Sequence, residues 1–154
     1  MGGAVIVLRR CETGEHFVGE VPIQLFRCDA FRLKLYLEEA SGVVLRGLSS
    51  LGVYEEPIHI CQGYILSEAR RVLTERGFRV ETVRIVGETQ EMAEREFIRS
   101  LVRLGVGDEE DVRRMRSFNG FLRWVLEDPE RREIYVKTGW PSWPRLKGGA
   151  NLSP

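Results

Sequence analysis

Two places in the chain combine polar side chains with the start of a predicted helix. In residues 57–64, a short apolar run ends in Gln62 and Gly63, and an amphipathic pattern begins at once. Residues 86–90 repeat this layout about one strand–helix unit later. Ligands and chemistry in α/β proteins usually occupy such junctions between a strand and a helix. We therefore expect the functional site at these two junctions.

The first junction carries a histidine and a cysteine. If residues 58–61 are extended, His59 and Cys61 point to the same side of the strand. Histidine exchanges a proton near neutral pH, and a thiol at a helix N-terminus ionises more readily than a free one. The two side chains thus offer a base and a nucleophile. The alternative is that Cys61 is a packed thiol and His59 a half-buried strand residue, which is the commoner arrangement.

Both junctions also offer groups that hold anions. The amide of Gln62 and free N–H groups at the helix starts can bind a phosphate or carboxylate. If the two strands run parallel, both junctions open at the same edge of a sheet. The alternative for the second junction is that Thr89 caps a helix and Gly87 forms a turn. The shared cleft would be lined by His59, Cys61, Gln62, Gly63, Glu88, Thr89 and Gln90.

Composition indicates a folded protein with no general affinity for nucleic acid. The chain has 154 residues, 43% hydrophobic and 30% charged, which suits one domain with a full core. Lys plus Arg and Asp plus Glu both number 23, so the net charge is zero and only a local basic face can bind nucleic acid. Three lysines against twenty arginines, with few amides, suit a protein from a hot environment, and a GC-rich genome is the alternative.

The cysteines predict neither disulfides nor a metal site. Cys11, Cys28 and Cys61 form no pair with metal-ligand spacing, and we expect no metal and no cofactor. The N-terminal apolar run, residues 4–8, is too short for a secretion leader, and no run has the length of a membrane span. These observations predict a cytoplasmic protein without a membrane partner.

Strand and helix patterns alternate along the chain. The first two strands form an antiparallel hairpin, and Asn119 and Gly120 in the last helix indicate a kink or a close approach by a ligand or another backbone. Strands are expected at residues 4–8, 17–25, 43–48, 58–61, 78–86 and 134–137, and helices at 29–40, 62–76, 89–104 and 108–127.

This pattern predicts one α/β domain over residues 1–138, with a mixed β-sheet of about four to five strands flanked by helices. The hairpin makes the sheet mixed and the strand–helix units make it partly parallel. Residues 139–154 are expected to be an irregular tail rich in Trp and Pro, disordered at its end. Trp140 and Trp143 of this tail either fold back over the domain or fill a pocket on a partner subunit.

Arginines and aromatic residues interleave in the last predicted helix and beyond, as in proteins that bind single-stranded RNA or DNA. Acidic residues dilute this stripe, so a salt-bridged face and core packing explain it better. The stripe comprises Arg113, Arg114, Arg116, Phe118, Phe121, Arg123 and Trp124.

Three functions remain after the motifs for nucleotide-binding loops, zinc proteases and serine hydrolases are found absent. The first is a binding module for an anionic small molecule or an RNA end at the two junctions. The second is a hydrolase or nuclease-like enzyme in the same cleft, using His59 and Cys61 or the carboxylates of Glu88 and Glu20. The third is a homodimer that buries the tail tryptophans against its partner.

Overall fold

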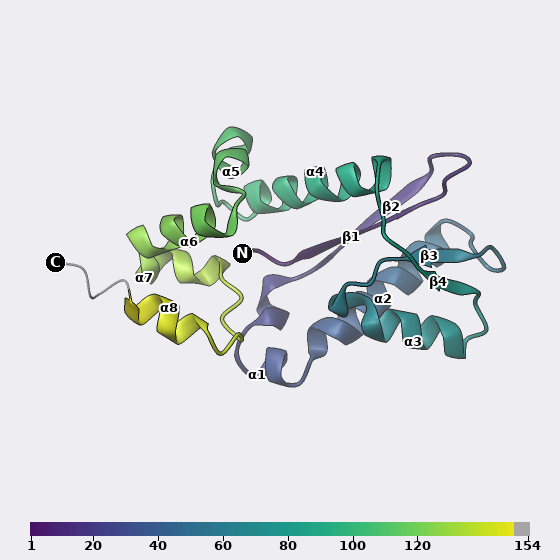
Figure 1. The fold of residues 1–154 in the computed structure, drawn as a ribbon, viewed down its shortest axis with the longest axis horizontal. Coiled ribbons are helices and arrows are strands. Elements are labelled where there is room, and N and C mark those ends of the chain that lie inside the picture. The colour runs from purple at the N-terminus through teal and green to yellow at the C-terminus, as the bar shows by residue number, and fades with distance from the viewer. Residues whose placement is uncertain (150–154) are drawn as a thin grey trace.

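The computed structural model describes residues 1–149 and confirms a mixed α/β architecture. Two small sheets and the helices that flank them form one end of an elongated molecule, and helices alone form the other (Figure 1). The predicted single sheet is wrong in detail, because the strands pair as two separate two-stranded sheets. The predicted disordered end, residues 150–154, lies outside the described residues.

The first sheet is the predicted antiparallel hairpin. β1 (Ala4–Arg9) pairs with β2 (His16–Val21), with Val7 opposite Val18. The turn closes with hydrogen bonds between the backbones of Arg10 and Glu15 and of Gly14 and Arg10. The hairpin runs along the middle of the molecule and so contacts both of its ends (Figure 1).

Helix α2 (Leu35–Ser50) packs against one face of the hairpin, after η1 (Ile23–Phe26) and α1 (Cys28–Arg32). The predicted helix end at residues 41–42 and the strand at 43–48 are wrong, because α2 continues through both. Val43 and Val44 are buried under the hairpin, so tertiary packing outweighs their preference for strands. A Cβ at Gly47 would lie 2.7 Å from the ring of Phe17, so the close approach depends on this glycine.

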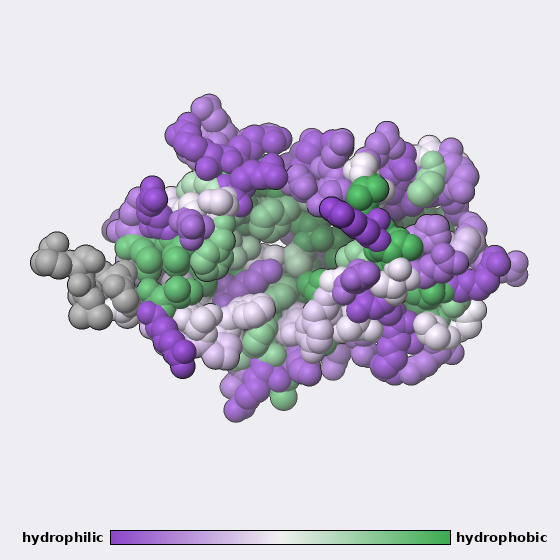
Figure 2. Space-filling view, in the orientation of Figure 1, coloured by the Kyte–Doolittle hydropathy of each residue, from purple (hydrophilic) through white to green (hydrophobic). Residues whose placement is uncertain are grey.

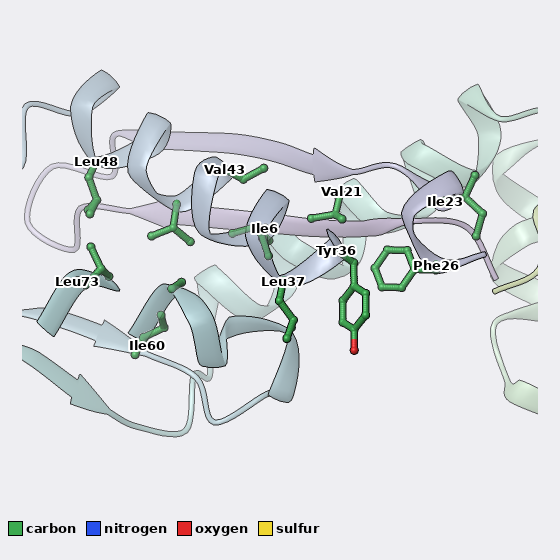
Figure 3. Close-up of a cluster of buried hydrophobic side chains, with 13 residues drawn as sticks. Ile6, Val21, Ile23, Phe26, Tyr36, Leu37, Val43, Leu48, Ile60 and Leu73 are labelled. Atoms are coloured by element: carbon green, nitrogen blue, oxygen red, sulfur yellow. The ribbon is translucent and has the colours of Figure 1, made fainter. Parts of the chain in front are cut away.

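The second sheet pairs β3 (Ile58–Ile60) with β4 (Val80–Thr82) in parallel, as the two-junction hypothesis requires. η2 (Tyr64–Leu66) and α3 (Ser67–Glu75) connect the strands. Apolar side chains from the hairpin, α2, β3 and α3 point toward one another in one buried cluster (Figure 3). Its members include Ile6, Val21, Val43, Leu48, Ile60 and Leu73.

Helix α4 (Glu88–Arg103) joins the two ends of the molecule and matches the predicted helix closely. It runs along β1 in the opposite direction, and an ion pair fixes each of its ends. Arg9 pairs with Glu88 at the start of the helix, and Arg103 at its end pairs with Glu20 of β2. Both partners in the second pair are partly exposed, so these contacts orient α4 more than they stabilise it.

The helical end contains α5 (Glu109–Met115), α6 (Phe118–Glu127), α7 (Pro129–Arg132), η3 (Glu133–Tyr135) and α8 (Trp143–Gly149). The predicted edge strand at 134–137 is wrong, since η3 occupies half of it. The expected irregular tail is wrong for α8. A second buried cluster holds this end together, with Ile98, Leu101, Val106 and Val112 at its centre and Met1, Phe121 and Trp124 around them.

The predicted helix at 108–127 is two helices, and Asn119 and Gly120 lie at the start of the second. The Ser117 side chain accepts a hydrogen bond of 3.0 Å from the Gly120 N–H and so caps α6. A Cβ at Gly120 would lie 2.5 Å from the carbonyl oxygen of Met115. The close backbone approach that this glycine indicates is therefore made by the end of α5.

Candidate functional site

The carboxyl ends of β3 and β4 lie at the same edge of the small sheet. The register pairs Ile58 with Val80, His59 with Glu81 and Ile60 with Thr82. The Val83 N–H donates to the Ile60 carbonyl at 2.9 Å and carries the pairing past the end of β4. The chain segments that leave both strands here are the two junctions predicted from the sequence.

His59 lies beside an acidic neighbour on the adjacent strand. Its Nε2 is 3.4 Å from a carboxylate oxygen of Glu81, and the two side chains are 56% and 68% exposed. Water competes for such an exposed pair, so it contributes little to stability. Glu81 was not predicted as a site residue, because only the parallel register brings it to His59.

The loop after β3 is held by an arginine that was not predicted from the sequence. The Arg70 side chain on α3 donates hydrogen bonds to the carbonyl oxygens of Cys61, at 2.7 Å, and Gly63, at 3.2 Å. The Arg70 side chain is half-buried, whereas Gln62 and Gly63 of the loop are exposed. The loop is therefore fixed on its inner side and open to solvent on its outer side.

Cys61 does not lie at the start of an α-helix, which corrects the expected geometry of the thiol. A 3₁₀ turn, Tyr64–Leu66, comes first, and α3 begins only at Ser67. The field of a helix falls off within its first turn, so α3 does not activate the Cys61 thiol in the way we expected. Cys61 is half-buried, whereas Cys11 and Cys28 are exposed.

Polar side chains of the second junction form hydrogen bonds and an ion pair with other residues of the chain. Gly87, with a φ of 67°, is the N-cap of α4, so Thr89 lies inside the first turn and does not cap it. Glu88 pairs with Arg9. The Gln90 amide donates to Glu94 at 3.0 Å, one helical turn further along. These contacts connect the junction to the hairpin and to its own helix.

The two junctions leave the sheet in different directions. From β3 the chain turns to η2 and α3, and from β4 it rises to the start of α4 beside the hairpin (Figure 1). Within residues 1–149, no hydrogen bond or ion pair joins residues 59–63 to residues 87–90. The structure thus brings together the candidates of the first junction and leaves Glu88, Thr89 and Gln90 on α4.

Another arginine, Arg84, lies at the sheet edge. It follows Val83, whose N–H makes the last hydrogen bond between the two strands, in the link to α4. It is exposed, and it has no carboxylate partner in the part of the chain that the structure describes. The sequence pattern predicts a strand through Arg84, so its position at the edge could not be recognised.

The two tail tryptophans contact their own chain. Trp143 is 7% exposed, and its Nε1–H donates to Glu133 at 2.5 Å, while Lys147 pairs with the same carboxylate at 2.7 Å. These hydrogen bonds hold the pKa of Glu133 below its ordinary value. Trp140 is 56% exposed and packs with tilted rings against Phe31. At least Trp143 therefore folds back over the domain.

Three arginines of the stripe of arginine and aromatic residues form ion pairs, as the preferred interpretation predicts, and Arg123 has no ion-pair partner within residues 1–149. Arg113 and Arg114 pair with Glu109 and Glu110 one turn earlier, and Arg116 pairs with Glu94. Phe121 and Trp124 belong to the second buried cluster. The stripe is thus mainly a salt-bridged surface above a packed core.

Lys137 is a further cation of interest that was not predicted from the sequence. Its Nζ lies 4.2 Å from the centre of the Phe26 ring, and burial lowers its pKa from 10.5 to about 8. A signal in the sequence is that lysine is rare in this arginine-rich chain, and lysine can lose its proton where arginine cannot.

Comparison with known proteins does not extend these observations. No family model, curated protein or solved structure matches the chain. Within residues 1–149, no three side chains of His, Cys, Asp or Glu gather in a way that could hold a metal ion. None of the helices in this part of the chain combines the length and the apolar character needed to cross a bilayer.

Proposed function

We propose that the protein binds a terminal phosphate, carried by a small molecule or an RNA end, at the carboxyl edge of β3 and β4. The observation that carries this proposal is that the fixed loop after β3 and an arginine without an ion pair within residues 1–149 lie at the same edge of the sheet. Arg70 holds the carbonyls of Cys61 and Gly63, and Arg84 at the same edge has no carboxylate partner within residues 1–149.

The chemistry of the edge suits a phosphate oxygen. A guanidinium gives two parallel donors to an oxyanion, and the amide of Gln62 and the N–H of Gly63 add neutral donors. Because the Nη1 group of Arg70 donates to two backbone carbonyls, Arg70 acts as a positioning residue for the loop.

The second junction has a smaller part in this proposal than the sequence suggested. Glu88 would repel an anion and is paired with Arg9, and Gln90 donates to Glu94. An enzyme at the same edge has less support, because Cys61 lies outside the first turn of α3. A dimer built on Trp143 also has less support, because that side chain is buried in its own chain.

The test is titration of the protein with inorganic phosphate, adenosine monophosphate, and a short RNA with either a 5′-phosphate or a 5′-hydroxyl. Shifts of backbone amide resonances report the binding position. We expect shifts at Gln62, Gly63 and Arg84 with the probes that bear a phosphate. Among these probes, the one whose phosphate is carried by the same kind of molecule as in the natural ligand should bind most tightly. Arg84→Gln should weaken binding at least about tenfold, the loss of one charge-assisted contact.

The matched control is Arg76→Gln, at the end of α3, because this arginine is also exposed and without an ion pair within residues 1–149. It removes the same charge from the opposite end of the sheet. Equal weakening by both variants would mean a diffuse charge effect, and the absence of shifts at residues 61–63 and 84 would overturn the proposal.

A further inference from the structure

Lys137 lies where the helical end of the molecule meets the other end. It follows η3, and its Nζ is 4.2 Å from the centre of the ring of Phe26, which belongs to the buried cluster of the hairpin and α2. Phe26 in turn stacks on Tyr36, with ring centres 5.0 Å apart (Figure 3). Hydrophobic side chains also gather on the surface between the two ends (Figure 2). The Lys137 amine is therefore placed among apolar groups.

This amine has no counter-ion in the part of the chain that the structure describes. Within residues 1–149, no carboxylate pairs with Lys137 and no hydrogen bond engages its Nζ, whereas Lys147 pairs with Glu133 at 2.7 Å. The neighbouring charge is also positive, since burial and the charge on Lys137 lower the pKa of the Met1 α-amino group to about 5. Removing an ammonium group from water without a partner disfavours its charged form. The fold therefore favours the neutral amine at this position.

The Lys137 nitrogen still reaches solvent. The side chain is half-buried, and within residues 1–149 no side-chain nitrogen or oxygen is both sealed from solvent and without a hydrogen-bond partner. Because Nζ has no such partner, it is not sealed. A desolvated lysine amine that a small molecule can reach is a nucleophile toward carbonyl groups. Arginine outnumbers lysine twenty to three in this chain, and it keeps its proton and could not act in this way.

We propose that Lys137 binds a small apolar aldehyde covalently, as an imine. The nitrogen lone pair attacks the carbonyl carbon, and the carbonyl oxygen takes up one proton from the nitrogen as its π bond breaks. The resulting carbinolamine loses its hydroxyl group and the second N–H hydrogen as one molecule of water, and a C=N bond forms. The step needs no oxidant, reductant or metal. An aldehyde suits the half-buried position because its carbonyl carbon carries a single substituent, and the apolar neighbours favour an apolar one.

The proposed site is separate from the carboxyl edge of β3 and β4, so either proposal can fail without the other. It also gives a reason for the unpaired lysine. Burying an ammonium group without a partner costs stability, and positions of this kind in folded proteins are often functional.

The three lysines of the chain allow a comparison within one protein. Propanal and sodium cyanoborohydride convert each imine to a stable secondary amine, and peptide mass spectrometry reports the labelling rate of every amine. Lys34 is exposed and Lys147 is paired with Glu133, so both serve as controls. Burial lowers the pKa of Lys137 to about 8, so at about pH 7.5 we expect it to be labelled at least about tenfold faster than either control.

A variant and a denatured sample complete the test. Lys137→Arg keeps a cation over Phe26 and removes the nucleophile, so it should lose this adduct while Lys34 and Lys147 are labelled as before. In about 8 M urea the preference should disappear, because the surroundings of the amine are lost. Equal labelling of the three lysines in the folded protein, or an adduct at the Met1 α-amino group alone, would overturn the proposal. So would a preference that persists in urea, since the local sequence and not the fold would then cause it.

Discussion

The Arg70 guanidinium donates a hydrogen bond of 2.7 Å to the Cys61 carbonyl and a second one to Gly63. This contact fixes the loop between β3 and η2. Arg70→Met keeps much of the apolar stem and removes both donors. We expect it to lower the free energy of unfolding by about 1–2 kcal/mol, because hydrogen bonds to a charged group are among the stronger ones. Urea denaturation measures this loss.

Hydrogen exchange separates a local effect from a general one. In Arg70→Met, the amides of Leu66 and Val83, which donate to the Gly63 and Ile60 carbonyls beside this loop, should exchange faster than in the wild type, while those of α4 should change only with global stability. Arg71→Met on the same helix is the control, because Arg71 pairs only with glutamates at the surface of α3. An equal loss of stability in both variants would contradict the role given to Arg70.

Two glycines of α2 should respond oppositely to alanine. A Cβ at Gly47 would lie 2.7 Å from the Phe17 ring and 2.9 Å from Leu8, so Gly47→Ala should lower the free energy of unfolding by about 1–3 kcal/mol. Gly42→Ala should raise it by about 0.5–1 kcal/mol, because alanine favours helix. Its Cβ would meet only the flexible end of Arg46. Thermal and urea denaturation compare the two variants.

Acid should release α8 from the helical end. The bonds from Lys147 and Trp143 lower the pKa of Glu133, so the folded state prefers the carboxylate. The stabilisation is complete above about pH 4.3, the ordinary glutamate value, and is lost as the pH falls through the lowered pKa. We expect the Trp143 indole N–H resonance to shift in this acid range.

Glu133→Gln provides the control for this titration. The amide keeps an oxygen that accepts a hydrogen bond and does not titrate, so the acid shift of the Trp143 resonance should disappear. The Trp140 resonance should be unchanged in both proteins, because its ring contacts Phe31 and is largely exposed. An acid shift that persists in Glu133→Gln would assign the effect to another group.

Lys137 should oppose folding at neutral pH. Burial lowers its pKa from 10.5 to about 8, so the unfolded chain binds more protons between these values and stability rises with pH across that window. Lys137→Met should raise the free energy of unfolding at pH 7 by about 1–2 kcal/mol. The loss of the contact between the lysine and the Phe26 ring reduces this gain.

The gain from Lys137→Met should shrink above about pH 10, where the wild-type amine is neutral in the fold. Lys34→Met is the control, because Lys34 is exposed and its removal should leave stability almost unchanged at either pH. Urea denaturation at about pH 7 and about pH 10.5 makes the comparison. A gain independent of pH would mean that the introduced methionine simply packs better than the lysine.

Local patterns predicted the elements whose boundaries are marked by the sequence itself. The hairpin follows from alternation around a turn, and α4 follows from a clear amphipathic stripe after Gly87. The parallel order of β3 and β4 was also expected from the strand–helix units. In each case one short stretch contained the signal, and tertiary packing did not oppose it.

The sequence-based predictions were wrong where tertiary packing decides the secondary structure. Val43 and Val44 resemble a strand, yet burial against the hairpin makes them helical. The residues 134–137 alternate like an edge strand, but within residues 1–149 no neighbouring strand pairs with them. In the candidate site, Arg70 and Arg84 gain their places only from the turn before α3 and from the strand register. No spacing in the sequence reports either position.

The contact between residues 1–2 and the helical end has a consequence for synthesis. Met1 packs in the second buried cluster, and the Gly2 N–H donates to the Tyr135 carbonyl. A ribosome releases Met1 and Gly2 long before Tyr135, so these two contacts cannot form until η3 has emerged. The Met1 side chain is therefore without its partners in that cluster while the residues between them are still being synthesised.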